Sequence, residues 1–222
     1  MKLALLQPCL IPDLYYIAAI KKADKVIISS DDNWSRKGRT NRFLVRTNSS
    51  LHWITWPILT EDKKKKISEV RLDHSDNQWL IKMLRTLEQA YRNSIYFDHY
   101  EPEIKADFEE LRQFEYLIDA INYMNQKLWT YLEWSPESNK IIHLDNKLLG
   151  VNPKIVMDQL GASTIFMEEN GAQFQWQTGL QTKSLETYPV YKQHFGGFYS
   201  PCSVLDVLFE VGPEWYRIYD AI

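Results

Sequence analysis

The sequence predicts an α/β fold with a mixed, mainly parallel sheet, flanking helices and a central helical layer. Two observations lead to this prediction. Strand and helix patterns alternate over residues 1–60 and again over residues 140–167, and such alternation is typical of parallel sheets. Between these regions, residues 75–134 carry apolar side chains at helical spacing. We expect the 222 residues to form a single α/β domain with a helical insertion or layer at about 75–134.

The N-terminal region predicts a strand, a helix and a second strand. Met1–Leu6 is a largely apolar run, which is typical of a buried strand. Asp13 is a suitable N-cap for a helix over Leu14–Lys22. Val26–Ile28 then predicts the second strand. Because two strands joined by a helix run parallel, we expect their carboxyl ends to lie side by side.

The candidate site lies in the two loops at these carboxyl ends, Gln7–Asp13 and Ser29–Arg42. Ligands of open α/β sheets bind in the crevice at such strand ends. The second loop carries adjacent carboxylates, Asp31 and Asp32, which can serve as a general base and a ligand anchor. Its cationic side chains are Arg36, Lys37, Arg39 and Arg42. An ordinary solvated loop is the alternative interpretation, and the residue pattern leaves both open.

The middle of the chain predicts a hairpin and two helical regions. Phe43–Arg46 and Leu51–Leu59 are predicted strands joined by turn-forming residues. Ser75 and Gln78 fit a capping box at the start of the first helix. Pro102 is suited to the first position of the second helical region.

The second helical region is long, and we expect it to break near residues 113–115. A second strand–helix–strand unit should follow it and extend the parallel sheet. The elements predicted after the break are a strand at Lys140–His143, a helix at Asn152–Leu160 ended by Gly161, a strand at Ser163–Met167, a loop at Gly171–Gly179, and a helix at Ser203–Glu210 stopped by Gly212-Pro213.

Composition argues against several classes of function. A net charge of −3 gives no support for nucleic-acid binding. The N-terminal apolar run is cut by Gln7 and Pro8, unlike a signal peptide, and no apolar stretch has the length of a membrane span. Two cysteines, Cys9 and Cys202, and scattered histidines predict neither a disulfide framework nor a metal site. We expect a cytoplasmic protein that binds a small molecule, with no nucleic-acid partner and with its oligomeric state open.

Three sets of residues follow one another along the chain in a recognisable pattern. The first set is Gln7-Pro8, Pro12, Tyr16, Ala23-Asp24, Asp31-Asp32, Arg36-Lys37-Gly38, Asn41-Arg42 and His52-Trp53. The second set is Trp79, Leu87, Ala90-Tyr91 and Tyr96-Phe97. The third set is Tyr191-Lys192-Gln193, Gly196-Gly197-Phe198, Ser203, Asp206, Leu208-Phe209 and Gly212. Together, over nearly the whole chain, they resemble the WbqC-like protein family.

The resemblance implies a function in the synthesis of bacterial surface polysaccharides of the O-antigen type. It implies a transferase that modifies a nucleotide-linked amino sugar with an acyl or aminoacyl (glycyl) group. The cofactor stays open between an acyl or aminoacyl donor and ATP. The site residues that the resemblance implies are Gln7, Tyr16, Asp31, Asp32, Lys37, Asn41, Arg42, His52, Tyr191, Gln193 and Asp206.

Roles for these residues follow from the chemistry of acyl transfer. An attacking amine needs a base to receive its proton, so the candidate catalytic residues are His52, Asp31 and Asp32. The cations suited to a diphosphate or a donor carboxylate are Arg36, Lys37 and Arg42. Trp34 is suited to stack on a ring of the substrate. The remaining polar residues are expected to bind the substrate.

The sequence also departs from the family pattern, which leaves two alternatives open. Met83 stands where the central helix often has a histidine, and Phe166–Gly171 stands where a Tyr-x-Ser-Gly motif is usual. Cys9–Ile11 and Thr40 replace aromatic residues. One alternative is an ATP-dependent amide ligase of the nucleotidylyl-transferring type, although the histidine pair of such enzymes is missing. The other is a degenerate, non-catalytic protein that binds a sugar nucleotide or a partner.

Overall fold

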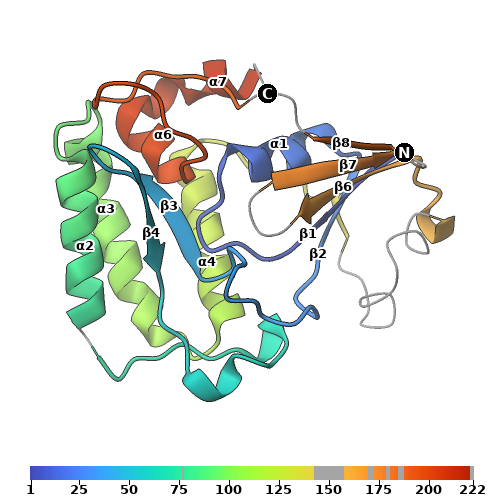
Figure 1. Ribbon diagram of the computed structural model, residues 1–222, viewed down its shortest axis with the longest axis horizontal. Coiled ribbons are helices and arrows are strands. Elements are labelled where there is room, and N and C mark those ends of the chain that lie inside the picture. The colour runs from blue at the N-terminus through green and yellow to red at the C-terminus, as the bar shows by residue number, and fades with distance from the viewer. Residues whose placement is uncertain (77, 143–157, 170–172, 179–180, 185–187, 221–222) are drawn as a thin grey trace.

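A computed structural model describes residues 1–76, 78–142, 158–169, 173–178, 181–184 and 188–220. Its larger sheet has the strand order β5-β2-β1-β6-β7-β8, and a separate two-stranded sheet pairs β3 with β4 (Figure 1). The strands of the larger sheet are β1 (Lys2–Leu6), β2 (Lys25–Ile28), β5 (Ile141–Ile142), β6 (Thr164–Glu169), β7 (Gln173–Thr178) and β8 (Gln181–Ser184). The first four are parallel neighbours and the last two are antiparallel. The predicted mixed α/β fold is confirmed.

β1 is an inner strand of this sheet, and its sequence explains why. Leu3, Ala4 and Leu6 are almost fully buried, as expected of a parallel strand that is covered on both faces. β1 joins β2 through α1 (Leu14–Lys22), and the Asp13 carboxylate caps that helix by accepting from the Tyr16 N–H at 3.0 Å. The predicted strand–helix–strand unit is therefore confirmed, and so is the parallel pairing of its strands.

The antiparallel edge of the sheet corrects one prediction. Gln173–Thr178 is strand β7, paired with β6, where we expected a loop over Gly171–Gly179. The segment reads Gln-Phe-Gln-Trp-Gln-Thr, an alternation of polar and apolar residues that is typical of a strand. The flanking glycines favoured the loop interpretation, and both lie outside the described residues.

The predicted helical layer is confirmed by α2 (Gln78–Tyr91), α3 (Phe97–Glu110) and α4 (Leu117–Tyr131). The expected break is present too, as the short 3-10 helix η3 (Leu111–Gln113) between α3 and α4. The predicted capping box of Ser75 and Gln78 is wrong. The Asp76 carboxylate accepts a hydrogen bond from the Gln78 backbone N–H at 2.7 Å, and the Ser75 backbone N–H donates to the Asp73 carboxylate.

Pro102 lies inside α3, not at its start. The helix begins at Phe97 because buried side chains in its first turns hold it against the rest of the protein. Phe97 packs on Phe209 with ring centroids 5.2 Å apart, and Tyr100 is also buried. Such tertiary packing offsets the hydrogen bond that a proline cannot donate.

The hairpin is confirmed as β3 (Arg42–Arg46) and β4 (Leu51–Thr55), with β4 ending two residues before Pro57. Two short 3-10 helices follow, η1 (Thr60–Asp62) and η2 (Ile67–Glu69). The C-terminal region forms α6 (Val204–Glu210), η4 (Gly212–Trp215) and α7 (Tyr216–Asp220). The helix predicted at Ser203–Glu210 is therefore confirmed.

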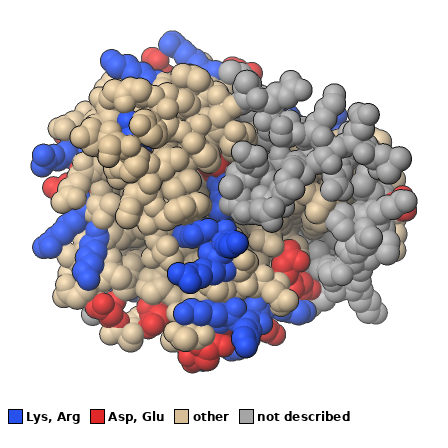
Figure 2. Space-filling view, in the orientation of Figure 1, with Lys and Arg blue, Asp and Glu red and all other residues tan. Residues whose placement is uncertain are grey.

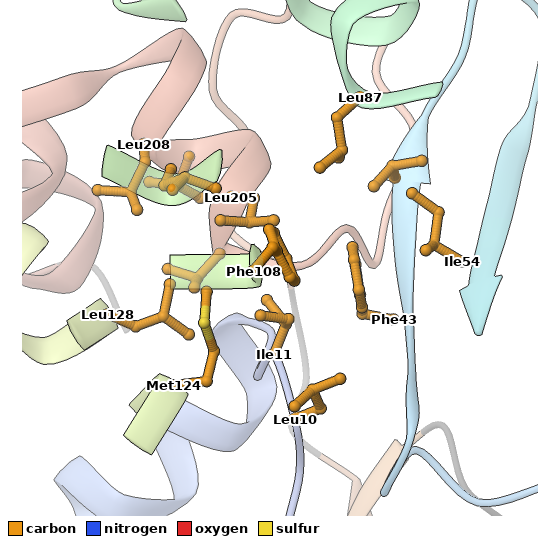
Figure 3. Packing of buried hydrophobic residues seen from close by; sticks show 14 of the residues in the cluster. Leu10, Ile11, Phe43, Ile54, Leu87, Phe108, Met124, Leu128, Leu205 and Leu208 are labelled. Atoms are coloured by element: carbon orange, nitrogen blue, oxygen red, sulfur yellow. The ribbon is translucent and has the colours of Figure 1, made fainter. Parts of the chain in front are cut away.

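The main hydrophobic core fills the space between the hairpin, the helical layer and α6 (Figure 3). Phe108 of α3 stacks on Phe43 of β3 and on Trp56, with ring centroids 6.1 and 6.0 Å away. Leu205 and Leu208 approach the same core from α6 (Figure 3). The hairpin therefore joins the helical layer rather than the six-stranded sheet.

The remaining predicted elements are described in part. The strand at Lys140–His143 is β5, and His143 lies outside the described residues. Of the helix at 152–160, residues 158–160 are described and are helical, and Gly161 follows with φ +63°, as expected of a helix-ending glycine. None of the described helices has both the length and the apolar composition that a membrane span requires.

Candidate functional site

The loops that follow β1 and β2 lie in contact, as predicted. The Gln7 side-chain amide donates to the Asp32 carboxylate at 3.2 Å. Arg39 and Asp13 form an ion pair of 2.8 Å, in which both side chains are nearly buried. These two contacts bring the candidate residues of both loops to one edge of the sheet.

Asp31 follows β2 by three residues, and its carboxylate has an unusual environment. Only 10% of the side chain is exposed, and Lys66 Nζ lies 3.5 Å from Oδ1. The other oxygen, Oδ2, is buried and accepts no hydrogen bond from the described residues. A buried carboxylate oxygen without a donor is costly, and it marks either a bound water or a group reserved for a ligand or a reaction.

A pocket of about 620 Å³ opens beside these loops. Pro8 and Ser30 contribute to it from the two strand-end loops, and Tyr16 contributes from α1. The Tyr16 hydroxyl donates to the Gln7 carbonyl at 3.1 Å, which ties the pocket wall to the first loop. The volume lies within the range of about 300–1,000 Å³ that is usual for small-molecule sites.

The far wall of the pocket is α4, which presents three amide side chains: Asn122, Asn125 and Gln126. None of the three is among the site residues predicted from the sequence. The signal was present as amides at i, i+3 and i+4, which share a helix face. The described lining carries no charged side chain, and most of it is apolar.

The cationic segment after Asp32, which carries Arg36, Lys37, Arg39 and Arg42, is held in its conformation by hydrogen bonds from a side chain to its own backbone carbonyls. Arg42 donates to the carbonyls of Gly38 and Lys37 at 2.7 and 2.6 Å and lies over the Trp53 ring, 4.1 Å from its centroid. Burial lowers the pKa of Arg42, and repulsion from the charges of Arg36 and Arg39 lowers it further. Positive charge is therefore concentrated here, and a bound anion would relieve it.

Arg36 and Lys37 are exposed, and neither forms an ion pair with a described residue. Figure 2 shows lysine and arginine side chains gathered near the middle of one face and again toward its lower edge, where acidic side chains lie among them. The two exposed cations are therefore available to a diphosphate or a carboxylate.

Trp34 and Asn41 engage each other. The Trp34 indole N–H donates to Asn41 Oδ1 at 3.2 Å, and Asn41 Nδ2 donates to the Trp56 carbonyl at 2.7 Å. Both ends of the buried Asn41 amide are thus used within the protein. The pair fixes the second loop onto the hairpin, while the half-buried Trp34 ring keeps a partly open face.

His52 is the third predicted catalytic residue. It is exposed on β4, opposite Val45 of β3. Among the described residues, no hydrogen bond or ion pair joins it to Asp31 or Asp32. Of the three predicted catalytic side chains, Asp32 contacts Gln7 and Asp31 contacts Lys66, so no common contact joins them among the described residues.

Tyr191, Gln193 and Asp206 form a separate, buried cluster. The Asp206 carboxylate accepts from Tyr191 at 2.5 Å, from Gln193 at 2.9 Å and from Tyr91 at 2.9 Å. Burial raises the pKa of Asp206, and these hydrogen bonds partly offset the rise by stabilising the charged form. The cluster fastens the segment before α6 to the helical layer, and none of its residues lines the pocket.

A second polar cluster contains the residue types of a hydrolytic triad but not its geometry. Ser94 and Glu210 both contact the same ring nitrogen of His194, Nδ1. A triad needs the serine and the carboxylate on opposite nitrogens of the ring. Glu210 also accepts from the His194 backbone N–H at 3.1 Å, which indicates a structural anchor.

The positions that depart from the family pattern are structural where they are described. Met83 is buried in the main core, and Phe166 is buried on β6. Thr40 is also buried. Asn170 and Gly171, the end of the segment that replaces the Tyr-x-Ser-Gly motif, lie outside the described residues.

Comparisons with known proteins agree with the pattern in the sequence. A protein of Mycobacterium tuberculosis strain H37Rv, named Uncharacterized protein Rv1507c, is 24% identical over 242 aligned positions, which cover 96% of this chain and 95% of that protein. No solved structure matches the chain. The sequence model of the WbqC-like protein family matches residues 7–218. The chain therefore belongs to the WbqC-like protein family.

Proposed function

We propose that this protein is an enzyme that transfers an acyl or aminoacyl group to the amine of a nucleotide-linked amino sugar in surface-polysaccharide synthesis. The observation that carries the proposal is the buried Oδ2 of Asp31, close after the carboxyl end of β2, which accepts no hydrogen bond from the described residues. The pocket that Ser30, the residue before Asp31, helps to line has the size of a small-molecule site. The resemblance of the sequence to the WbqC-like pattern supplies the substrate class.

The proposed reaction is an addition to a carbonyl group followed by loss of a leaving group. The sugar amine attacks the acyl carbon of the donor, so a carbon–nitrogen bond forms and the bond from the acyl carbon to the leaving group breaks. The proton released by the nitrogen passes to Asp31 Oδ2 and then to the leaving group. A base placed within hydrogen-bond reach of the nitrogen is the requirement for this step.

The other residues of the loops have supporting roles in this proposal. Gln7 holds Asp32 through its amide, and Asp32 positions the hydroxyls of the substrate. Arg36 and Lys37 bind the diphosphate or the carboxylate of the donor. Asp31 is the preferred base because its buried Oδ2 accepts no hydrogen bond from the described residues, whereas His52 is exposed on β4.

A direct assay tests the proposal. Purified protein is incubated with UDP- and TDP-linked amino sugars together with acetyl-CoA, or together with glycine and ATP, and products are identified by mass spectrometry. We expect the mass of the amino sugar to increase by one acyl or glycyl group. A product that needs glycine and ATP, with pyrophosphate released, would favour the ligase alternative.

Asp31→Asn is the matched variant, because it keeps the shape of the side chain and removes its basicity. We expect it to lower turnover at least about a hundredfold, the lower end of the effect of roughly 10²–10⁴ that a general base contributes. Asp98→Asn, an exposed aspartate on α3, is the control and should leave turnover unchanged. Full activity in Asp31→Asn would remove Asp31 from the mechanism, and bound but unchanged substrate in all assays would favour the non-catalytic alternative.

A further inference from the structure

We infer that the pocket between α4 and β2 binds the nucleoside part of the substrate, with the base among the α4 amides and the ribose at Asp32. This inference rests on the proposed function, because it names the part of a nucleotide-linked substrate that the site recognises. It is argued from the lining of the pocket and from its place in the sheet.

The lining of the pocket favours a flat, uncharged, hydrogen-bonding group. No charged side chain lines its described part, so a phosphate or a carboxylate would be buried there without a counter-charge. A plain acyl chain would cover the side chains of Asn122 and Gln126 and the oxygen of Asn125 without offering them a hydrogen bond. A nucleobase satisfies both conditions, since its faces are apolar and its edge carries donors and acceptors.

The amide row has one member whose orientation is fixed. Asn125 Nδ2 donates to the carbonyls of Cys9 and Ile121 at 2.9 and 2.8 Å. Its remaining polar atom, Oδ1, is an acceptor, which suits the ring N–H of a uracil or thymine or the amino group of an adenine. Asn122 and Gln126 are exposed on the same helix face and can complete the edge.

Flat contact surfaces are available on both sides of such a base. Trp129, one turn beyond the amides on α4, lines the pocket and is half-buried. The opposite wall is aliphatic and includes Val26 and Ile28 of β2. Ring stacking on tryptophan is tolerant of the identity of the base.

The position of Asp32 fits a ribose. In doubly wound α/β folds, an acidic residue at the end of the second strand hydrogen-bonds the ribose hydroxyls. Asp32 follows β2 by four residues, and Ser30, two residues before it, lines the pocket. A nucleoside with its base against α4 would therefore direct its ribose toward Asp32 and its phosphates out of the pocket.

Isothermal titration calorimetry with UDP, TDP and ADP tests the base site. We expect at least one of the three to bind, and the double variant Asn122→Ala/Gln126→Ala to weaken that binding about tenfold, the loss expected for one or two hydrogen bonds. Gln89→Ala is the control: it removes an exposed amide from a different helix, α2, and should leave nucleotide binding unchanged. Circular dichroism and thermal melting check that the exposed substitutions preserve the fold.

A second titration tests the ribose contact. Asp32→Ala should weaken UDP more than 2′-deoxy-UDP, because the deoxy compound lacks the hydroxyl that the carboxylate binds. An equal loss for both compounds would overturn the ribose assignment. A preference for ADP over UDP and TDP would identify ATP as the source of the nucleoside and still support the pocket.

The outcomes separate this inference from the proposed function. Failure of UDP, TDP and ADP to bind would overturn the pocket assignment, as would binding that the α4 double variant leaves unchanged. Amino-sugar modification that persists in the double variant with an unchanged KM would overturn it as well, while the proposed function would stand. Nucleotide binding that depends on the amides, without any transfer to an amino sugar, would support the pocket and contradict the proposed function.

Discussion

Asp13 and Arg39 form a nearly buried ion pair of 2.8 Å between the N-terminus of α1 and the loop after β2. The same carboxylate caps α1 through its other oxygen. One side chain therefore fixes both the start of the helix and the path of the loop that carries Asp31 and Asp32. The geometry of the candidate site depends on this pair although neither residue belongs to the pocket.

Asp13→Asn should destabilise the protein by about 3–5 kcal/mol, because it keeps an oxygen for the helix cap but leaves the buried guanidinium without its counter-charge. Urea unfolding followed by tryptophan fluorescence gives the free energy of unfolding. Asp13→Asn/Arg39→Met should cost less than the sum of the two single variants. Additive losses would show that the two side chains do not act as a pair.

We expect the buried carboxylate of Asp62 to make part of the free energy of unfolding sensitive to acid. Arg71 donates two side-chain hydrogen bonds to its buried carboxylate, at 2.9 and 3.0 Å, and these hold the pKa of Asp62 well below its usual range. A lowered pKa stabilises the folded state above the unfolded pKa of about 3.9, and this contribution is lost as the pH falls toward the folded value. The difference in unfolding free energy between wild type and Asp62→Asn should therefore be large at pH 7 and shrink below about pH 5. A difference that stays constant with pH would contradict the assignment.

Two glycines allow backbone strain to be separated from steric overlap. Gly212 has φ +58°, and a Cβ there would lie 2.6 Å from the Tyr96 ring, whereas Gly161 has φ +63° and no atom of the described residues would lie within 4 Å of its Cβ. Gly161→Ala should cost about 1–2 kcal/mol, the penalty of the left-handed conformation alone. Gly212→Ala should cost more by about 1–3 kcal/mol, since the ring must move. Equal costs in urea unfolding would contradict the overlap.

We expect the exposed cations of the second loop, Arg36 and Lys37, to bind the phosphates of a nucleotide and not its nucleoside. Arg36→Ala/Lys37→Ala is expected to weaken UDP binding about tenfold or more while leaving uridine binding unchanged. Lys82→Ala/Arg85→Ala, a pair of exposed or partly exposed cations on α2, is the matched control. Calorimetry at two salt concentrations adds a check, because the loss should diminish as salt screens the charges.

The sequence predicted best where short-range rules decide the structure. The cap at Asp13, the apolar runs on both sides of it and the parallel rule were enough to place the loop Gln7–Asp13 beside the loop Ser29–Arg42. The start of α3 at Phe97 could not be predicted from local sequence, because it depends on packing against Phe209, which is distant in the chain. The strand Gln173–Thr178 was hidden by its flanking glycines, since strand pairing is a property of the sheet and not of the segment.

Only part of the candidate site could be predicted, because the sequence shows short-range patterns better than long-range packing. Loop residues that follow adjacent strands can be grouped from sequence, whereas a pocket wall contributed by a helix 90 residues later needs the packing of the whole chain. Asp206 was predicted to be a site residue, and it shows that a sequence pattern can also group residues that have different roles. Its partners Tyr91 and Tyr191 lie on separate segments, so the sequence pattern identified a group of residues without distinguishing a buried anchor from a binding site.

The place of β1 in the sheet has a consequence for synthesis of the protein. Lys2 pairs with Thr164 of β6, so one edge of β1 has no partner until the ribosome has also made β6, about 160 residues later. At about 5–20 residues per second, that edge stays open for roughly 8–30 s. An apolar open edge is a template for pairing with other chains. Nascent chains that stall after α4 are therefore expected to aggregate or to bind chaperones, and the loop that contains Gln7 reaches its final position only when translation has passed β6.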